Sequence, residues 1–237
     1  MSSPDVLHFS IAILWCVLGF GSYYFLARSE KFKVLFKSTC KYLDKQGNQV
    51  LLQRALGLLF LGIFSVLIIG LLPGKGLQEF GLTFRFRNAL PWWTWILIPL
   101  ILALSYFTSR NPENLKQYPQ IRAGQWTPAM LVISGISWML FLVGYEFLFR
   151  GFVLFASLAI LDPVAAIALN TSLYAFAHFY KGPGETFGSI PAGILFCYLT
   201  MLSGNIWSAV ILHAVMALSN EWFSLKAHPD MSLIKVP

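Results

Sequence analysis

The sequence has few charged residues for its length. Asp, Glu, Lys and Arg make up 11% of its 237 residues, whereas 57% are hydrophobic. A soluble domain carries about 25% charged residues. Here the charges gather in short segments between long apolar runs. This pattern excludes an ordinary soluble domain and predicts a membrane protein, whose length measures bilayer crossings rather than globular domains.

Cysteine is scarce, and motifs for metals or nucleic acids are missing. Cys16, Cys40 and Cys197 form no CxxC pair, so we expect isolated core residues and neither a disulfide framework nor a zinc knuckle. The net charge of +7 comes without a zinc finger or an RNA-binding signature, which argues against nucleic acid and assigns the excess to loops beside lipid headgroups. Without an HExxH motif, we predict no cofactor, and zinc lacks a supporting pattern.

Apolar runs suited to membrane helices recur along the chain, since a span needs about 20 apolar residues. They lie at about 7–27, 52–73, 90–107 and 127–149, with shorter or interrupted runs at 151–161, 163–180, 188–203 and 205–223. Asp162-Pro163 and Gly204-Asn205 separate neighbouring helices. The predicted fold is all-α, a polytopic bundle of about eight transmembrane helices. We divide it into N-terminal helices with a basic loop (1–79), a core (80–224) and a short polar tail (225–237).

Basic residues after the first run suggest an orientation. No Lys or Arg precedes that run, and six follow it between Arg28 and Lys45, which predicts an external N-terminus and a cytoplasmic segment 28–50. This segment forms either a basic amphipathic helix lying in the interface or a solvated loop. Trp92, Trp93 and Trp95 are typical of an aromatic belt at a helix entrance.

A few ionisable residues lie within apolar runs: Glu146, Arg150, His178, His213 and Glu221. A charge at this depth costs about 2.5–3.5 kcal/mol on insertion scales, so such residues are functional candidates. Glu146 and Arg150, in "GYEFLFRG", are four residues apart, so they share a helix face and can pair. Either the pair only locks two helices together, or the carboxylate also acts as a base toward water.

Polar residues on two later runs share helix faces with the histidines. Asn170, Tyr174 and His178 recur every four residues and predict an interior polar stripe. His213 is followed by Asn220 at i+7. We expect Glu146 and both histidines to converge on one cavity, where they either activate a water for attack on a peptide bond or relay protons. No internal repeat supports a transporter.

Together these motifs resemble the CAAX protease and bacteriocin-processing (CPBP, or Abi) family of intramembrane proteases, which includes the Rce-type endopeptidases. The likeness runs from about Phe80 to Trp222. "EFLFRG" resembles the end of the EExxxR motif, "YAFAHF" is similar to the FxxxH motif, and "GNIWSAVILHA" resembles the final helix with the second histidine. "EFGLTFR" is similar to the lead-in of the family.

The resemblance implies a fold, a helical bundle with a cavity open to one side. It also implies an activity, that of a glutamic intramembrane protease. Its catalytic residues would be Glu146, Arg150, His178 and His213. A glutamate and a histidine would activate water, while the second histidine and an asparagine would stabilise the oxyanion. The substrate would be a membrane-associated peptide, prenylated or leader-type, and the location the cytoplasmic membrane of a prokaryote.

Two positions depart from the family pattern. Tyr145 stands where the first motif glutamate is expected, and Ala217 stands where the asparagine is expected. Either the chain belongs to a variant group that works with one motif glutamate, or it is a catalytically inactive relative that acts as a peptide-binding regulator or a bacteriocin self-immunity protein. The residues that would support a variant mechanism are Tyr145, Tyr174, Glu185, Asn170 and Asn220. Glu185 lies in the Pro/Gly-rich segment "HFYKGPGETFGSIPAG", and Asn220 would replace the asparagine only after a shift of about one turn.

The orientation conflicts with this resemblance. Counting crossings from an external N-terminus places Glu146 near the extracytoplasmic side, whereas Rce-type relatives work from the cytosolic side. The polarity reverses if one early run does not span the membrane.

Overall fold

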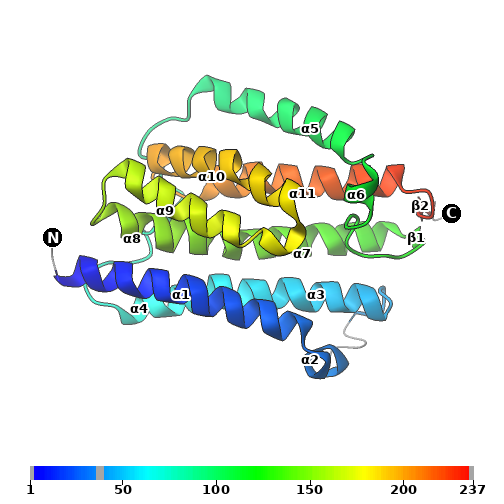
Figure 1. Cartoon of the computed structure of the whole chain (residues 1–237), viewed down its shortest axis with the longest axis horizontal. Helices are drawn as coiled ribbons and strands as arrows, with labels where there is room; N and C mark the ends of the chain where they lie inside the picture. The colour runs from blue at the N-terminus through cyan, green and yellow to red at the C-terminus, as the bar shows by residue number, and fades with distance from the viewer. Residues whose placement is uncertain (1–2, 36–39, 235–237) are drawn as a thin grey trace. The chain divides into compact units, whose positions relative to one another are not determined.

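The computed structural model describes residues 3–35 and 40–234, which are mostly helical (Figure 1). Four helical segments of the described chain are long and apolar enough to cross a membrane: Ser3–Arg28, Lys45–Leu71, Pro128–Leu158 and Pro183–Ser203. The apolar helices Trp92–Thr108 and Pro163–Phe176 are shorter. The predicted all-α membrane fold is therefore confirmed, whereas the count of about eight spans is not.

The chain divides into two compact units. Unit 1 comprises Met1–Tyr24, Gly57–Leu90 and Val143–Val210, and unit 2 comprises Phe25–Leu56, Pro91–Leu142 and Ile211–Pro237. Helices α1, α3, α7 and α11 contribute residues to both units.

Unit 1 is helical and has a small apolar core between α8, α9 and α10. Its elements are α1 (Ser3–Arg28) as far as Tyr24, the π-helix η1 (Leu58–Ile63), α4 (Phe64–Leu71), the π-helix η3 (Phe147–Val153), α8 (Leu154–Leu158), α9 (Pro163–Phe176), the 3-10 turn η4 (Phe179–Lys181) and α10 (Pro183–Ser203). Leu154, Ala166 and Cys197 form one cluster of buried core residues in this unit. Helix α9 lies alongside α10 (Figure 1).

Two predicted boundaries between helices in unit 1 are confirmed. Asp162 caps α9, because its Oδ1 accepts hydrogen bonds from the backbone nitrogens of Val164 (3.0 Å) and Ala165 (3.1 Å). Such a cap satisfies amide groups that a helix start leaves unpaired. Gly204 ends α10 in the left-handed conformation, with φ of 74°, which glycine adopts without steric cost.

Two other expectations for this unit were wrong. The runs at 127–149 and 151–161 form one helical segment, because α7 (Pro128–Glu146) continues through η3 and α8. Gly151, which lies between the two runs, allows close packing, since a Cβ there would lie 2.9 Å from the Phe80 carbonyl oxygen. Helix α10 begins at Pro183 and not at about residue 188 as expected, so most of the Pro/Gly-rich segment is helical and Pro191 lies inside the helix.

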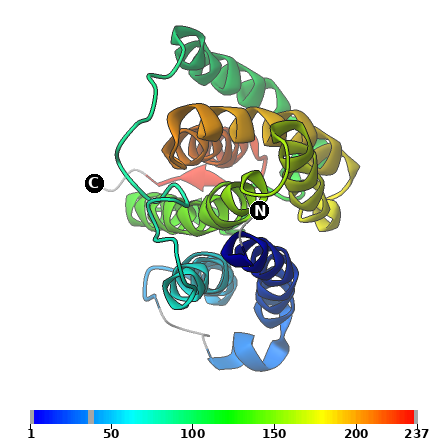
Figure 2. The same ribbon diagram turned by 90° about the vertical axis from the view of Figure 1, so that its left-hand side faces the viewer.

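Unit 2 combines helices with one short parallel strand pair. Its elements are α2 (Glu30–Leu35), α3 (Lys45–Gly57) as far as Leu56, the 3-10 helix η2 (Trp92–Ile96), α5 (Leu97–Thr108), α6 (Pro112–Leu115), β1 (Gln125–Trp126), α7 as far as Leu142, α11 (Trp207–Ala227) from Ile211, and β2 (Ser232–Leu233). Strand β2, drawn in red in Figure 2, pairs with β1. Trp126 is buried in a cluster with Leu43, Ile121 and Leu225.

The basic segment after α1 is only partly helical. Helix α2 covers Glu30–Leu35, residues 36–39 lie outside the described chain, and residues 40–44 are not helical. Lys33 Nζ lies 2.6 Å from Glu30 Oε1, and this hydrogen-bonded charge lowers the pKa of the exposed Glu30 carboxyl.

Trp92 and Trp95 are exposed in η2, at the start of the apolar segment Trp92–Thr108, as expected for an aromatic belt.

Candidate active site

Glu146 and Arg150 form a fully buried ion pair in unit 1. Glu146 is the last residue of α7, and Arg150 lies one turn further along in η3. Arg150 Nη1 lies 3.1 Å from Glu146 Oε2, and neither side chain is exposed. The pairing predicted from their spacing is confirmed. Because removal of one partner would leave an uncompensated buried charge, the two residues depend strongly on each other.

Aromatic rings enclose the guanidinium of Arg150. Its Cζ lies 3.9 Å from the ring centre of Tyr174 on α9 and 5.3 Å from that of Phe196 on α10. A guanidinium is planar, weakly hydrated and attracted to ring faces. Rings from two further helices therefore help to hold the positive charge that pairs with Glu146.

His178 follows the C-terminal end of α9 and is buried. Its Nδ1 lies 2.8 Å from the backbone oxygen of Tyr174. A carbonyl oxygen only accepts hydrogen bonds, so Nδ1 donates, and in the neutral ring Nε2 is then the nitrogen that carries the acceptor lone pair. The backbone of α9 thus selects the tautomer in which Nε2 can accept a proton.

Two tyrosines connect the ion pair with His178. The ring centre of Tyr145, which precedes Glu146, lies 5.8 Å from that of Tyr174 and 6.2 Å from that of His178. The rings of Tyr174 and His178 are 4.6 Å apart. Unit 1 therefore brings Tyr145, Glu146, Arg150, Tyr174 and His178 into one buried cluster, called the site cluster below.

Asn170, the third member of the predicted stripe, is also buried. Its Nδ2 donates to the backbone oxygen of Phe149 at 2.6 Å, and Cys197 Sγ donates to its Oδ1 at 3.1 Å. Phe149 belongs to the π-helical turn that carries Arg150. Asn170 therefore ties α9 and α10 to that turn, and the predicted interior stripe is confirmed.

The other candidate residues lie elsewhere. Glu185 is in the first turn of α10, where its Oε2 lies 2.8 Å from Lys181 Nζ. His213 is half-buried on the part of α11 that belongs to unit 2. Asn220, also in unit 2, donates from Nδ2 to Asn114 Oδ1 at 3.1 Å. The convergence of His213 with Glu146 and His178 stays a prediction.

A second buried ionic group, which was not predicted from the sequence, lies in unit 2. Arg54 Nη2 of α3 lies 3.5 Å from Glu221 Oε1 of α11, and both side chains are buried. Arg54 Nη1 donates to Ser137 Oγ at 2.7 Å and to the Ser134 backbone oxygen at 2.9 Å. The buried Glu221 was the available signal, because a carboxylate at this depth requires a partner.

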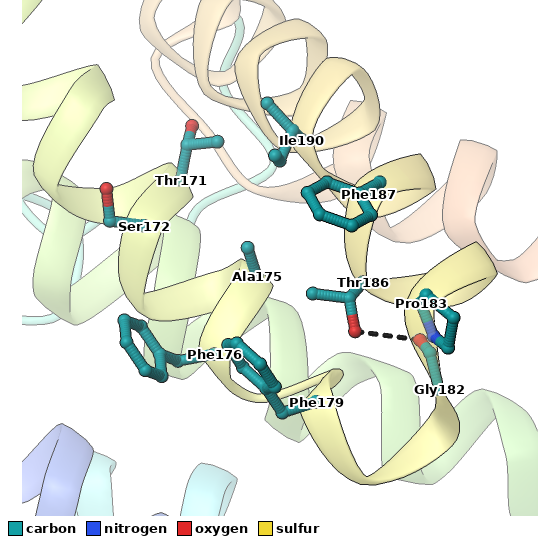
Figure 3. Close-up of a pocket in the computed structure, with 10 residues that line it drawn as sticks. All are labelled: Thr171, Ser172, Ala175, Phe176, Phe179, Gly182, Pro183, Thr186, Phe187 and Ile190. Atoms are coloured by element: carbon teal, nitrogen blue, oxygen red, sulfur yellow. Dashed lines mark hydrogen bonds between the residues drawn. The ribbon is translucent and has the colours of Figure 1, made fainter.

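An apolar cavity of about 450 Å³ opens between α9, η4 and the start of α10 (Figure 3). Its lining residues are Thr171, Ser172, Ala175, Phe176, Phe179, Gly182, Pro183, Thr186, Phe187 and Ile190. The Thr186 hydroxyl donates to the Gly182 backbone oxygen at 2.8 Å (Figure 3) and to that of His178 at 3.2 Å. The largely exposed rings of Phe176 and Phe187 suit a hydrocarbon ligand better than a polar one.

The described residues include no group of three or more His, Cys, Asp or Glu side chains that could hold a metal ion. The expected lack of a cofactor stays a prediction.

Residues 127–219 match a protein family described as type II CAAX prenyl endopeptidase Rce1-like. The matched segment contains Glu146, Arg150, His178 and His213 and lies within the region of likeness recognised from the sequence, so that recognition is confirmed. No curated protein and no solved structure matched the chain significantly. The family match and the apolar helices support a membrane protease function.

Proposed function

Because residues 127–219 carry the Rce1-like CAAX prenyl endopeptidase segment, we propose that the protein is an intramembrane endopeptidase that hydrolyses a peptide bond of a membrane-associated peptide, prenylated or leader-type. The observation that carries the proposal is the site cluster. It joins a buried carboxylate to a histidine whose Nδ1 is occupied by a backbone carbonyl. The proposed location is the cytoplasmic membrane of a prokaryote.

In the proposed reaction, water attacks the scissile carbonyl carbon. Glu146, assisted by His178 Nε2, accepts a proton from the water as its oxygen bonds to that carbon. The second histidine, His213, donates a hydrogen bond to the developing oxyanion. The peptide C–N bond then breaks, and the proton passes to the leaving amine. Arg150 acts as a positioning residue, since it holds Glu146 in place.

The apolar cavity supports a substrate that carries a hydrocarbon chain. The cavity is adjacent to the histidine in the sequence, because Phe179, which lines the cavity, directly follows His178. A hydrocarbon group seated there would bring the attached peptide toward the histidine. Binding of this group would supply affinity for the substrate, and the site cluster would hydrolyse the peptide bond.

The test is cleavage of a fluorogenic prenylated peptide by the purified protein in nanodiscs. Glu146→Gln and His178→Ala should each lower kcat by about 100-fold or more, the usual contribution of a proton-transfer group. Glu113→Gln and His228→Ala change the same residue types at positions that do not belong to the site cluster, and should retain activity. Cleavage that survives in both Glu146→Gln and His178→Ala would overturn the residue assignment.

A second candidate is a catalytically inactive relative that binds a membrane peptide as a regulator or self-immunity protein. It is favoured by Tyr145 and Ala217 at motif positions and by the close pairing of Glu146 with Arg150. A single-turnover assay with the protein in excess separates the two candidates. Peptide binding without product would support the inactive relative, whereas product formation that requires His178 would exclude it.

A further inference from the structure

The connector between α4 and η2 carries an exposed basic and aromatic run. Phe84, Arg85, Phe86 and Arg87, called the FRFR segment below, are all exposed, and the two phenylalanines reach 80% and 51% exposure. Within residues 3–35 and 40–234, neither Arg85 nor Arg87 forms a salt bridge. The segment therefore presents two uncompensated positive charges beside two exposed rings.

The backbone of the FRFR segment is held in place by hydrogen bonds, so its side chains are exposed on an ordered part of the chain. It is attached to the junction between α10 and α11, which belongs to the same unit. Hydrogen bonds run from Arg87 N to Ser203 O (2.6 Å), from Asn205 Nδ2 to Arg85 O (3.1 Å) and from Trp207 Nε1 to Thr83 O (2.9 Å). The ring of Phe84 stacks on Trp207, with centroids 4.7 Å apart. The attachment involves the backbone and the Phe84 ring and leaves the side chains of the two arginines exposed.

The attachment places the segment at the end of a candidate membrane span. Helix α10 has 21 residues, which extend over about 31 Å at 1.5 Å per residue, close to the roughly 30 Å of a hydrocarbon core. Figure 1 shows the connector after α4 passing the end of α10 that leads into α11. A segment bonded to Ser203 therefore lies at the level of the lipid headgroups when α10 spans the bilayer.

We propose that the FRFR segment binds the headgroups of anionic phospholipids. Arg85 and Arg87 contact lipid phosphates, for which a guanidinium provides paired donors. Phe84 and Phe86 lie at the boundary between headgroups and acyl chains, where the phenylalanines of interfacial segments are buried. Of the acidic residues of the connector and α1, Glu79 accepts a hydrogen bond from Gly76 N, and Asp5 pairs with Lys75; neither forms a salt bridge with the two arginines. This proposal does not depend on proteolytic activity.

The experiment titrates short-chain phosphatidylglycerol or phosphatidylcholine into the full-length protein in a neutral detergent and measures binding by microscale thermophoresis. The wild type should bind phosphatidylglycerol more tightly. Arg85→Gln/Arg87→Gln should weaken that binding by about fivefold for each arginine removed, while Arg85→Lys/Arg87→Lys should largely retain it. The control Lys116→Gln/Lys226→Gln removes the same charge from exposed positions in unit 2 and should change little.

Thermal unfolding without lipid checks that each variant is folded. Equal loss in the control pair would overturn the proposal, because the effect would then follow net charge alone. A wild type that binds both lipids equally would also overturn it. Glycerol phosphate that competes as well as phosphatidylglycerol would identify a site for soluble anions and contradict binding to a membrane surface.

Discussion

At the scale of single residues, the chain stabilises two buried arginines in different ways. Arg150 pairs with a carboxylate four residues away and lies against aromatic rings. Arg54 spreads its donors over serine oxygens, a glutamine and Glu221. The first arrangement suits a charge that must stay close to a reacting group. The second suits a cation whose role is to connect helices.

Replacing Arg54 by lysine tests this structural role. An ammonium keeps the charge but cannot reproduce the fork that reaches Ser137 and Glu221 together. Since a hydrogen bond to a charged group contributes about 1.5–3 kcal/mol, we expect Arg54→Lys to lower the free energy of unfolding by about 2–3 kcal/mol, measured by denaturant unfolding in detergent. Arg110→Lys, at an exposed position in the same unit, should change it by less than about 0.5 kcal/mol. Equal effects of the two substitutions would contradict the role of Arg54.

The two ion pairs also show which contacts a sequence reveals. Glu146 and Arg150 lie one helical turn apart, so helix geometry alone predicted their pairing. Arg54 and Glu221 are 167 residues apart, and no local periodicity connects them. The sequence marked Glu221 as a costly charge, but only the fold identified its partner. In the same way, the spacing of Asn170, Tyr174 and His178 predicted a shared face but not the backbone carbonyls that Asn170 and His178 bind.

At the scale of elements, the close packing of backbones explains the features that were predicted wrongly or missed from the sequence. The runs at 127–149 and 151–161 were expected to be separate, yet Gly151 between them lies in a π-helical turn beside the Phe80 carbonyl. Likewise, η1 approaches the end of α7 through Gly62 and Gly144. Such contacts between small residues let membrane helices approach closely. They depend on which helices become neighbours, so hydrophobic periodicity does not predict them.

Alanine substitutions at two glycines of one helical segment should separate packing from helix propensity. A Cβ at Gly62 would lie 2.8 Å from the Gly144 Cα, whereas a Cβ at Gly70 would have nothing within 4 Å. We expect Gly62→Ala to destabilise the protein by about 1–3 kcal/mol, since overpacking forces backbone shifts. Gly70→Ala should be neutral or stabilising by up to about 1 kcal/mol, because alanine favours helix. Thermal unfolding in detergent would measure both, and equal melting temperatures would contradict the close contact.

At the scale of the whole molecule, the number of crossings sets which loops share a side of the membrane. The four long apolar segments are joined by shorter helices whose role composition alone does not determine. Among these, η2 and α5 together cover Trp92–Thr108, or about 28 Å of helix, slightly less than a hydrocarbon core of about 30 Å. Leu100, Leu104 and Phe107 are exposed along this segment, with tryptophans before them and Arg110 after them. These features favour a crossing with lipid-facing side chains.

Single-cysteine labelling in intact membranes tests this crossing. The probes are Lys31→Cys after the first span, Glu79→Cys after the second and Glu113→Cys after α5, all at exposed positions. Cys40 is replaced by serine, while Cys16 and Cys197 are buried and can remain. Because each crossing reverses the side, a spanning α5 places Glu113→Cys with Lys31→Cys and opposite Glu79→Cys. A membrane-impermeant maleimide added to one side should therefore label either Lys31→Cys and Glu113→Cys together or Glu79→Cys alone. Labelling of Glu113→Cys together with Glu79→Cys would instead show that α5 lies along the membrane surface.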